Sequence, residues 1–125
     1  MSDKLILSPL GHTWIFDIDG TLVKHNGYKI DGFDTLLPGV KLFFERNINK
    51  DDFVILTTSR NDDVKNYTIN FLKENGIRYN VIIFNLPYGE RILINDKKPS
   101  GLNVSKSINL ERNIFSIDVV IDNNL

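Results

Sequence analysis

The sequence predicts an α/β protein, a Rossmann-like layered domain with a largely parallel central sheet. Short apolar runs typical of buried strands alternate with stretches of helical periodicity. Three of these runs end in polar clusters, at residues 17–21, 57–60 and 95–101. Because the carboxyl ends of parallel strands share one rim of the sheet, where ligand sites form, we expect the three clusters to meet there. A chain of 125 residues has the size of one domain, which we expect to span residues 1–125.

The first strand and a flap that follows it are expected near the amino terminus. Thr13–Ile18 is rich in β-branched and aromatic residues, as in a buried strand. Asn26 and Gly27 then lie between two short runs that could pair. Both residues tolerate the positive φ of a type I′ turn, so we expect a β-hairpin flap over the end of the first strand.

Two helices and four further strands are expected after the flap. Pro38 and Gly39 suit the start of a helix whose apolar residues share one face. A second helix is expected over 62–75, because its apolar residues recur at helical spacing and Gly76 can end it. The strands are expected at residues 53–57, 81–84, 91–95 and 114–121.

Composition excludes several classes of protein. The 15 basic and 16 acidic residues give a net charge of -1, without the basic surface that duplex nucleic acid or an acidic membrane would need. The lack of cysteine excludes a disulfide framework and a thiolate metal site. No apolar run is long enough for a secretory signal or a bilayer span, so we expect a soluble, cytoplasmic protein.

The first polar cluster places two carboxylates, Asp17 and Asp19, one residue apart at the end of the first strand. On an extended chain both point to the same side, and two such charges repel unless a cation balances them. Mg²⁺ is bound by one or two carboxylates together with water and a substrate phosphate, which resolves the repulsion. We therefore expect Mg²⁺ and a phosphoryl group here, with Gly20 and Thr21 among the phosphate-binding residues. The alternative is a solvated pair of carboxylates in a turn.

The second cluster offers groups that can bind an anion. The hydroxyl of Thr58 and the backbone N–H groups around Ser59 can hold a phosphate oxygen at the strand end. The guanidinium of Arg60 can grip a second anionic group of the substrate. The alternative is that these residues only cap the following helix.

The third cluster adds a carboxylate and two cations. Asp96 follows the apolar run 91–95 and can complete the carboxylate set of the metal, with Asn95 beside it as support. Lys97 or Lys98 can neutralise charge on the transferred phosphoryl group. The alternative for the two lysines is a solvated surface pair.

In this order, the motifs FDIDGT, ILTTSR and ILINDKKP resemble those of haloacid dehalogenase superfamily phosphatases, over about residues 12–100. The resemblance implies that Asp17 is a nucleophile that forms an aspartyl-phosphate. It implies that Asp19 protonates the leaving alcohol and then activates water, while its backbone carbonyl binds Mg²⁺. Thr58 would hold the phosphoryl group, Asp96 would complete the metal site, and Lys98 or Lys97 would balance the phosphoryl charge.

The sequence departs from the family pattern at two points. Many members carry the phosphate-binding lysine before the fourth strand, but residues 85–91 contain none, which leaves Arg91 as a further candidate. Asn95 and Asp96 also replace the paired acids of many relatives. The intervals between the motifs are too short for a cap domain. Capless relatives include tetrameric phosphatases of sugar-acid phosphates, and the third motif is similar to small phosphatase-like proteins of bacterial capsular polysaccharide metabolism.

The leading hypothesis is a Mg²⁺-dependent phosphomonoester hydrolase that acts on a small phosphorylated metabolite such as a sugar phosphate. One alternative, a nucleic-acid end phosphatase, would need clustered Lys and Arg. Another is a non-catalytic binding module, although Asp17 and Asp19 are both intact. We expect no nucleic acid and no membrane as partners. A homodimer or homotetramer is compatible with each hypothesis, since residues 117–121 could pair across chains.

Overall fold

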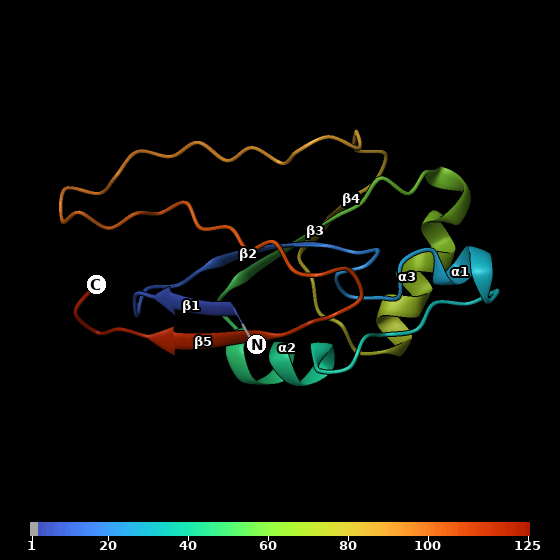
Figure 1. The fold of residues 1–125 in the computed structure, drawn as a ribbon, viewed down its shortest axis with the longest axis horizontal. Coiled ribbons are helices and arrows are strands. Elements are labelled where there is room, and N and C mark those ends of the chain that lie inside the picture. Colours follow the sequence, from blue (N-terminus) through green and yellow to red (C-terminus); the bar gives the residue numbers. More distant parts are fainter. Residues whose placement is uncertain (1–2) are drawn as a thin grey trace.

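The computed structural model describes residues 3–125. Its elements are joined in an order that alternates strands and helices (Figure 1). They are β1 (Asp3–Leu7), β2 (Thr13–Asp17), α1 (Gly27–Ile30), α2 (Val40–Asn47), β3 (Phe53–Thr57), the 3₁₀ helix η1 (Asp62–Val64), α3 (Lys65–Glu74), β4 (Val81–Ile83) and β5 (Ile117–Ile121). All strand pairs within the described elements are parallel, which confirms the predicted α/β class.

The strands form two parallel sheets rather than a single one. The central sheet has the order β2-β3-β4, and Ile15 lies opposite Ile55, which lies opposite Val81. The second sheet pairs β1 with β5, with Leu5 opposite Val119. The structure thus confirms the expected strands at 13–18, 53–57, 81–84 and 114–121, and adds β1, which the sequence patterns did not predict.

An aromatic cluster joins one face of the central sheet to α2. Trp14 and Phe16 alternate with exposed residues along β2, so both point to the same side. The ring of Phe43 lies 5.6 Å from that of Trp14, and the ring of Phe44 lies 4.9 Å from that of Phe16. Phe115 adds a contact of 5.1 Å with Phe43 and links the second sheet to this core. Aromatic pairs of this kind contribute about 0.5–1.5 kcal/mol each beyond their burial.

The helix predicted over 62–75 is confirmed as η1 followed by α3. The side chain of Asn61 caps its start by accepting a hydrogen bond of 3.0 Å from the backbone N–H of Asp63. Gly76, with a φ of 67°, follows its end, as expected for a residue that must adopt a left-handed conformation. In residues 3–125 no helix combines the length and apolarity needed to cross a bilayer.

The predicted flap is present, but its turn is not the expected one. Residues 22–24 pair in antiparallel fashion with residues 35–37, since Lys24 N–H donates to the Thr35 carbonyl and Leu37 N–H donates to the Leu22 carbonyl. The type I′ turn predicted at Asn26 and Gly27 is wrong. The Asn26 carbonyl instead accepts hydrogen bonds from residues 29 and 30, so Asn-Gly starts the short helix α1.

The predicted strand over 91–95 is also wrong. Residues 85–112 form a long two-limbed segment, called here the excursion, which leaves β4 and runs away from the strand ends before returning to β5 (Figure 1). Ile92 is 82% exposed and Ile94 is 87% exposed. An apolar run becomes a strand only when a neighbouring strand takes up its backbone hydrogen bonds, and none of the described strands lies beside this one.

Candidate active site

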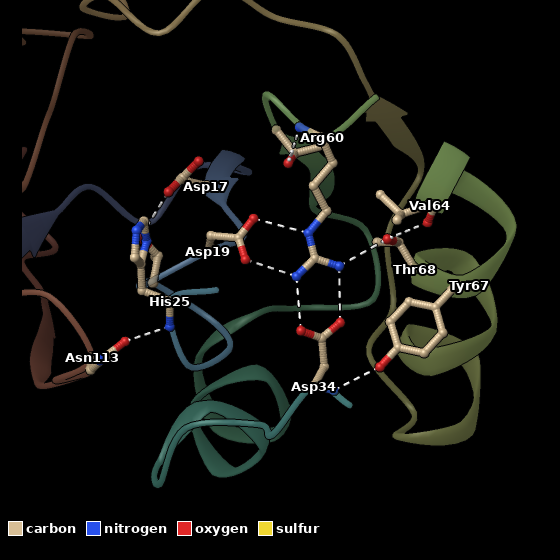
Figure 2. A network of polar contacts seen from close by, with 11 residues as sticks. Asp17, Asp19, His25, Asp34, Arg60, Val64, Tyr67, Thr68 and Asn113 are labelled. Carbon is tan, nitrogen blue, oxygen red and sulfur yellow. Dashed lines mark hydrogen bonds and ion pairs between the residues drawn. The ribbon is translucent and has the colours of Figure 1, made fainter. Parts of the chain in front are cut away.

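Two of the three predicted polar clusters meet at the carboxyl ends of β2 and β3. Asp17 is the last residue of β2 and lies opposite Thr57, the last residue of β3. The loops after these strands bring Asp19 and Arg60 into direct contact (Figure 2). The expectation that parallel strand ends gather these residues at one rim is therefore confirmed for the first two clusters.

Asp17 is the accessible carboxylate of the site. Its side chain is 47% exposed, and Oδ2 accepts a hydrogen bond of 3.3 Å from the Thr21 hydroxyl. Although the side chain is half exposed, the surrounding protein removes enough water to raise the pKa of Asp17 above its ordinary value. The charge of Asp19 raises the pKa further. Partial desolvation also makes a carboxylate a better nucleophile, because fewer waters must be displaced before it reacts.

A tight turn fixes the path between the two carboxylates. The Ile18 carbonyl accepts hydrogen bonds from the backbone N–H groups of Thr21, Leu22 and Val23. Gly20 has a φ of 80°, and a Cβ there would lie 3.2 Å from the Arg112 side chain. The left-handed conformation favours glycine at this position, and a Cβ would also force the Arg112 side chain to shift. Gly20 thus shapes the loop, and Thr21 reaches back to Asp17.

Arg60 holds the Asp19 carboxylate through two hydrogen bonds, one to each of its oxygens. Nε and Nη2 of Arg60 donate to the two carboxylate oxygens of Asp19 at 2.9 and 2.8 Å. Nη1 and Nη2 donate to the two oxygens of Asp34 at 2.9 and 2.8 Å, and Nη1 also donates to the Thr68 hydroxyl at 2.9 Å. A guanidinium has five N–H donors, and all five therefore have partners within the protein. In this arrangement Arg60 holds Asp19 and has no donor left for the substrate anion that the sequence assigned to it.

The guanidinium of Arg60 is buried and clamped. Its side chain is 1% exposed, and the ring of Tyr28 covers it at 4.3 Å, a cation–π contact. Burial by itself lowers the pKa of Arg60, but the hydrogen bonds and charges of Asp19 and Asp34 more than offset this effect and raise it. The cation is therefore permanent.

Thr58 and Ser59 lie in the same loop, with their hydroxyls engaged by the protein. Thr58 is 1% exposed; its hydroxyl accepts a hydrogen bond of 3.0 Å from the Arg60 N–H, and its own N–H donates to the Ile83 carbonyl. The Ser59 hydroxyl donates to the Pro87 carbonyl at 3.4 Å. These bonds shape the loop that presents Arg60, and phosphate binding by Thr58 stays a prediction.

The third cluster lies apart from the other two. Asn95, Asp96, Lys97 and Lys98 are all exposed on the excursion, where Lys97 forms an isolated bridge with Asn103. In the part of the chain that the structure describes, no three His, Cys, Asp or Glu side chains lie close enough together to hold a metal ion. The cation that the structure does bring to Asp17 is Arg91, whose Nη2 lies 3.9 Å from Oδ1.

The carboxylates present suit Mg²⁺ only in part. Asp17 is open, but both oxygens of Asp19 already accept hydrogen bonds from Arg60. One or two carboxylates suffice for Mg²⁺ when water and substrate phosphate supply the other ligands. The donor set therefore fits an ion that arrives together with a phosphate group.

Two residues of the network were missed by sequence reasoning. Asp34 lies in the loop between α1 and α2, and Thr68 lies within α3. Neither belongs to a recognisable motif, because the partner of a buried arginine is set by the fold and not by spacing along the chain. The one available signal is general: a buried arginine requires carboxylates close to it.

The site thus combines an accessible carboxylate with a second one held in place by a buried arginine. Arg91 supplies a nearby cation, and Thr21 supplies a hydroxyl. Such a set can attack an electrophile, transfer a proton and balance negative charge. Comparisons of the chain with protein-family models, with curated proteins and with solved structures found no match.

Proposed function

We propose that the protein is a phosphomonoester hydrolase of the haloacid dehalogenase type, acting on a small phosphorylated metabolite such as a sugar phosphate. The observation that carries this proposal is the arrangement of Asp17 and Asp19. The first is open and partly desolvated, and the second is fixed beside it by Arg60. One carboxylate is thus available to attack, and the other is oriented to move a proton.

In the first half-reaction, an Asp17 carboxylate oxygen attacks the phosphorus atom. The bond between phosphorus and the ester oxygen breaks, and the leaving oxygen takes a proton from the carboxylic acid form of Asp19. Each carboxylate oxygen has two acceptor positions, and Arg60 occupies one on each oxygen of Asp19. A position on Asp19 therefore remains for the transferred proton. The products are an alcohol and an aspartyl-phosphate on Asp17.

In the second half-reaction, water attacks the phosphorus atom of the aspartyl-phosphate. Asp19, now a carboxylate, accepts a proton from that water. The bond between phosphorus and the Asp17 oxygen breaks, which releases inorganic phosphate and regenerates the Asp17 carboxylate. Asp19 ends in its protonated form, ready for the next cycle.

Two cations would balance the phosphoryl charge. The Asp17 carboxylate and the Asp19 backbone carbonyl would hold Mg²⁺, which would neutralise negative charge on the phosphoryl oxygens. Arg91, which pairs with Asp17 at 3.9 Å, would supply the second cation. It takes the role that the family resemblance gave to Lys98 or Lys97, and Asp96 would join the metal site only if the excursion folds toward Asp17.

The second candidate is a non-catalytic binding module with the same fold. Its supporting observation is that Asp96 and both lysines lie outside the site, which leaves the metal set incomplete. Such a module would bind a phosphorylated ligand or Mg²⁺ without turning it over. Measured turnover separates the two candidates.

The decisive experiment measures phosphate release from an aryl phosphate and from a panel of sugar phosphates, with Mg²⁺ and with EDTA. The expected result is Mg²⁺-dependent turnover that Asp17→Asn lowers by about a thousandfold or more, since the amide cannot attack phosphorus. Asp51→Asn is the matched control, because Asp51 is an exposed aspartate outside the site. Wild-type protein that is inactive on every substrate, or an active Asp17→Asn variant, would overturn the proposal.

A further inference from the structure

Arg60 has two carboxylate partners in very different surroundings. Asp19 reaches the rim and is 19% exposed, whereas Asp34 is 1% exposed. Figure 2 shows the two carboxylates on adjacent edges of the guanidinium, with Asp19 on the side nearer to Asp17. Asp34 therefore takes no direct part in the chemistry proposed above, yet it binds the same group that holds Asp19.

Asp34 is itself fixed by its surroundings. Its backbone N–H donates to the Tyr67 hydroxyl at 2.7 Å, and its two oxygens accept from both Nη atoms of Arg60. A bidentate pair of this kind sets the plane of the guanidinium as well as its position. With that plane set and Tyr28 lying against it, the edge formed by Nε and Nη2 faces Asp19.

We propose that Asp34 is a positioning residue: it fixes the plane of the Arg60 guanidinium, so that Arg60 holds the Asp19 carboxylate in one orientation beside Asp17. This inference rests on the proposed function, in which Asp19 is the acid and base. It assigns a role in turnover to a residue that contacts neither the nucleophile nor the phosphoryl group.

The test compares Asp34→Asn with the wild type on two substrates. The amide keeps the shape of the side chain, but it places N–H donors against an Nη atom that needs an acceptor. We expect kcat to fall about tenfold with KM unchanged, as for partial loss of general acid–base catalysis. The fall should be larger for glycerol phosphate, whose alkoxide must be protonated as it leaves, than for p-nitrophenyl phosphate. A purely structural defect would lower both rates by the same factor.

A double variant shows whether Asp34 acts through Asp19. If it does, Asp34→Asn causes no further loss when Asp19→Asn is already present. If the double variant instead lost activity by the product of the two single-variant factors, the inference would be overturned. Asp31→Asn is the matched control, because Asp31 lies in the same segment and pairs with Lys24 at 2.8 Å, outside the Arg60 network. Its kinetics should equal those of the wild type.

A measurement without turnover separates failure of this inference from failure of the proposed function. The Nε–H of Arg60 is hydrogen-bonded to Asp19, so its proton resonance should exchange slowly with water in the wild type. Asp34→Asn should accelerate this exchange at least several-fold, and Asp31→Asn should not. If the wild type shows no phosphatase activity, the proposed function fails, and the positioning role is then decided by this resonance. Unchanged exchange in Asp34→Asn overturns it.

Discussion

At the scale of single residues, Asp17 and Asp19 have the same side chain and opposite surroundings. Asp17 is half exposed and carries a raised pKa, while Asp19 accepts two hydrogen bonds from a buried guanidinium. A difference of this kind is how one pair of carboxylates can take two roles in a reaction. The charge of Asp17 is therefore expected to cost stability, and that of Asp19 to support it.

The first prediction concerns the stability of Asp17→Asn. A raised pKa means that the folded state binds the proton more tightly than the unfolded chain, so ionisation of Asp17 destabilises the fold above that pKa. The variant should unfold at a higher temperature than the wild type near pH 7.5. This increase in unfolding temperature should shrink as the pH falls toward about 3.9, the pKa of an unperturbed aspartate. Thermal unfolding monitored by circular dichroism between pH 4 and 8 provides the measurement.

Asp19→Asn provides the contrast. An asparagine offers one acceptor oxygen in place of two and turns an N–H toward the donors of Arg60, so this variant should unfold at a lower temperature than the wild type. Equal shifts of the same sign in both variants would contradict the division of roles between the two carboxylates.

The second prediction concerns the cation near Asp17. Arg91→Gln should raise KM for an aryl phosphate about tenfold, because the positive charge closest to the carboxylate is lost. Lys106→Gln, an exposed substitution on the same excursion, is the control. A larger effect of Lys98→Gln than of Arg91→Gln would restore the role that the sequence gave to the lysine and would contradict the placement of Arg91.

At the scale of secondary-structure elements, Arg60 connects four parts of the chain. It follows β3 and contacts Asp19 after β2, Tyr28 in α1, Asp34 before α2 and Thr68 in α3. The flap is therefore fastened to the rim of the sheet through one side chain. Removing one member of a buried charge network is destabilising, because it leaves the remaining charges buried without compensation.

The third prediction is the effect of Arg60→Leu on stability. The substitution leaves Asp34 buried without a cation and removes the hydrogen bonds that Arg60 donates to Asp19. The free energy of unfolding should therefore fall by about 3–5 kcal/mol. Urea denaturation gives this value. Arg46→Leu, at an exposed position in the last turn of α2, should change it by less than about 1 kcal/mol. Similar losses in the two variants would show that the network contributes little.

At the scale of the whole molecule, one face of the central sheet and the excursion both expose apolar side chains. Ile15 and Phe53 are 52% and 43% exposed on that face, and Ile92 and Ile94 are more exposed still on the excursion. The helix α2 covers the opposite face through the aromatic cluster. The molecule therefore has a well-packed side and an open side.

The fourth prediction is the site of first cleavage in limited proteolysis. The excursion has few backbone hydrogen bonds, so trypsin should cut it at Arg91, Lys97 or Lys106 before it cuts elsewhere. Mass spectrometry of the early fragments identifies the position. A first cut within residues 3–84 would contradict this prediction. Slower cleavage with Mg²⁺ and orthophosphate present would show that the excursion closes on the site and would bring Asp96 back into consideration.

Local patterns in the sequence were enough to predict much of the fold. The strand at 13–18 and the helix at 62–75 follow from side-chain periodicity, a cap and a stop, all of which depend on neighbours in the chain. The same holds for the meeting of the first two polar clusters, since parallel strands bring their carboxyl ends to one rim. The residue types and their order along the chain were therefore sufficient to place both carboxylates at that rim.

Tertiary contacts decided the rest. Residues 91–95 have the composition of a strand, but a strand exists only if another strand accepts its hydrogen bonds, and that depends on the whole sheet. Arg60 was expected to bind the substrate. Instead its guanidinium donates hydrogen bonds to Asp34, which is 26 positions away along the chain, and to Asp19. Such a pairing depends on distance in space and on burial, and no local pattern encodes it. The residue types thus predicted which functional groups lie at the rim, whereas the tertiary structure determined which charged groups pair with one another.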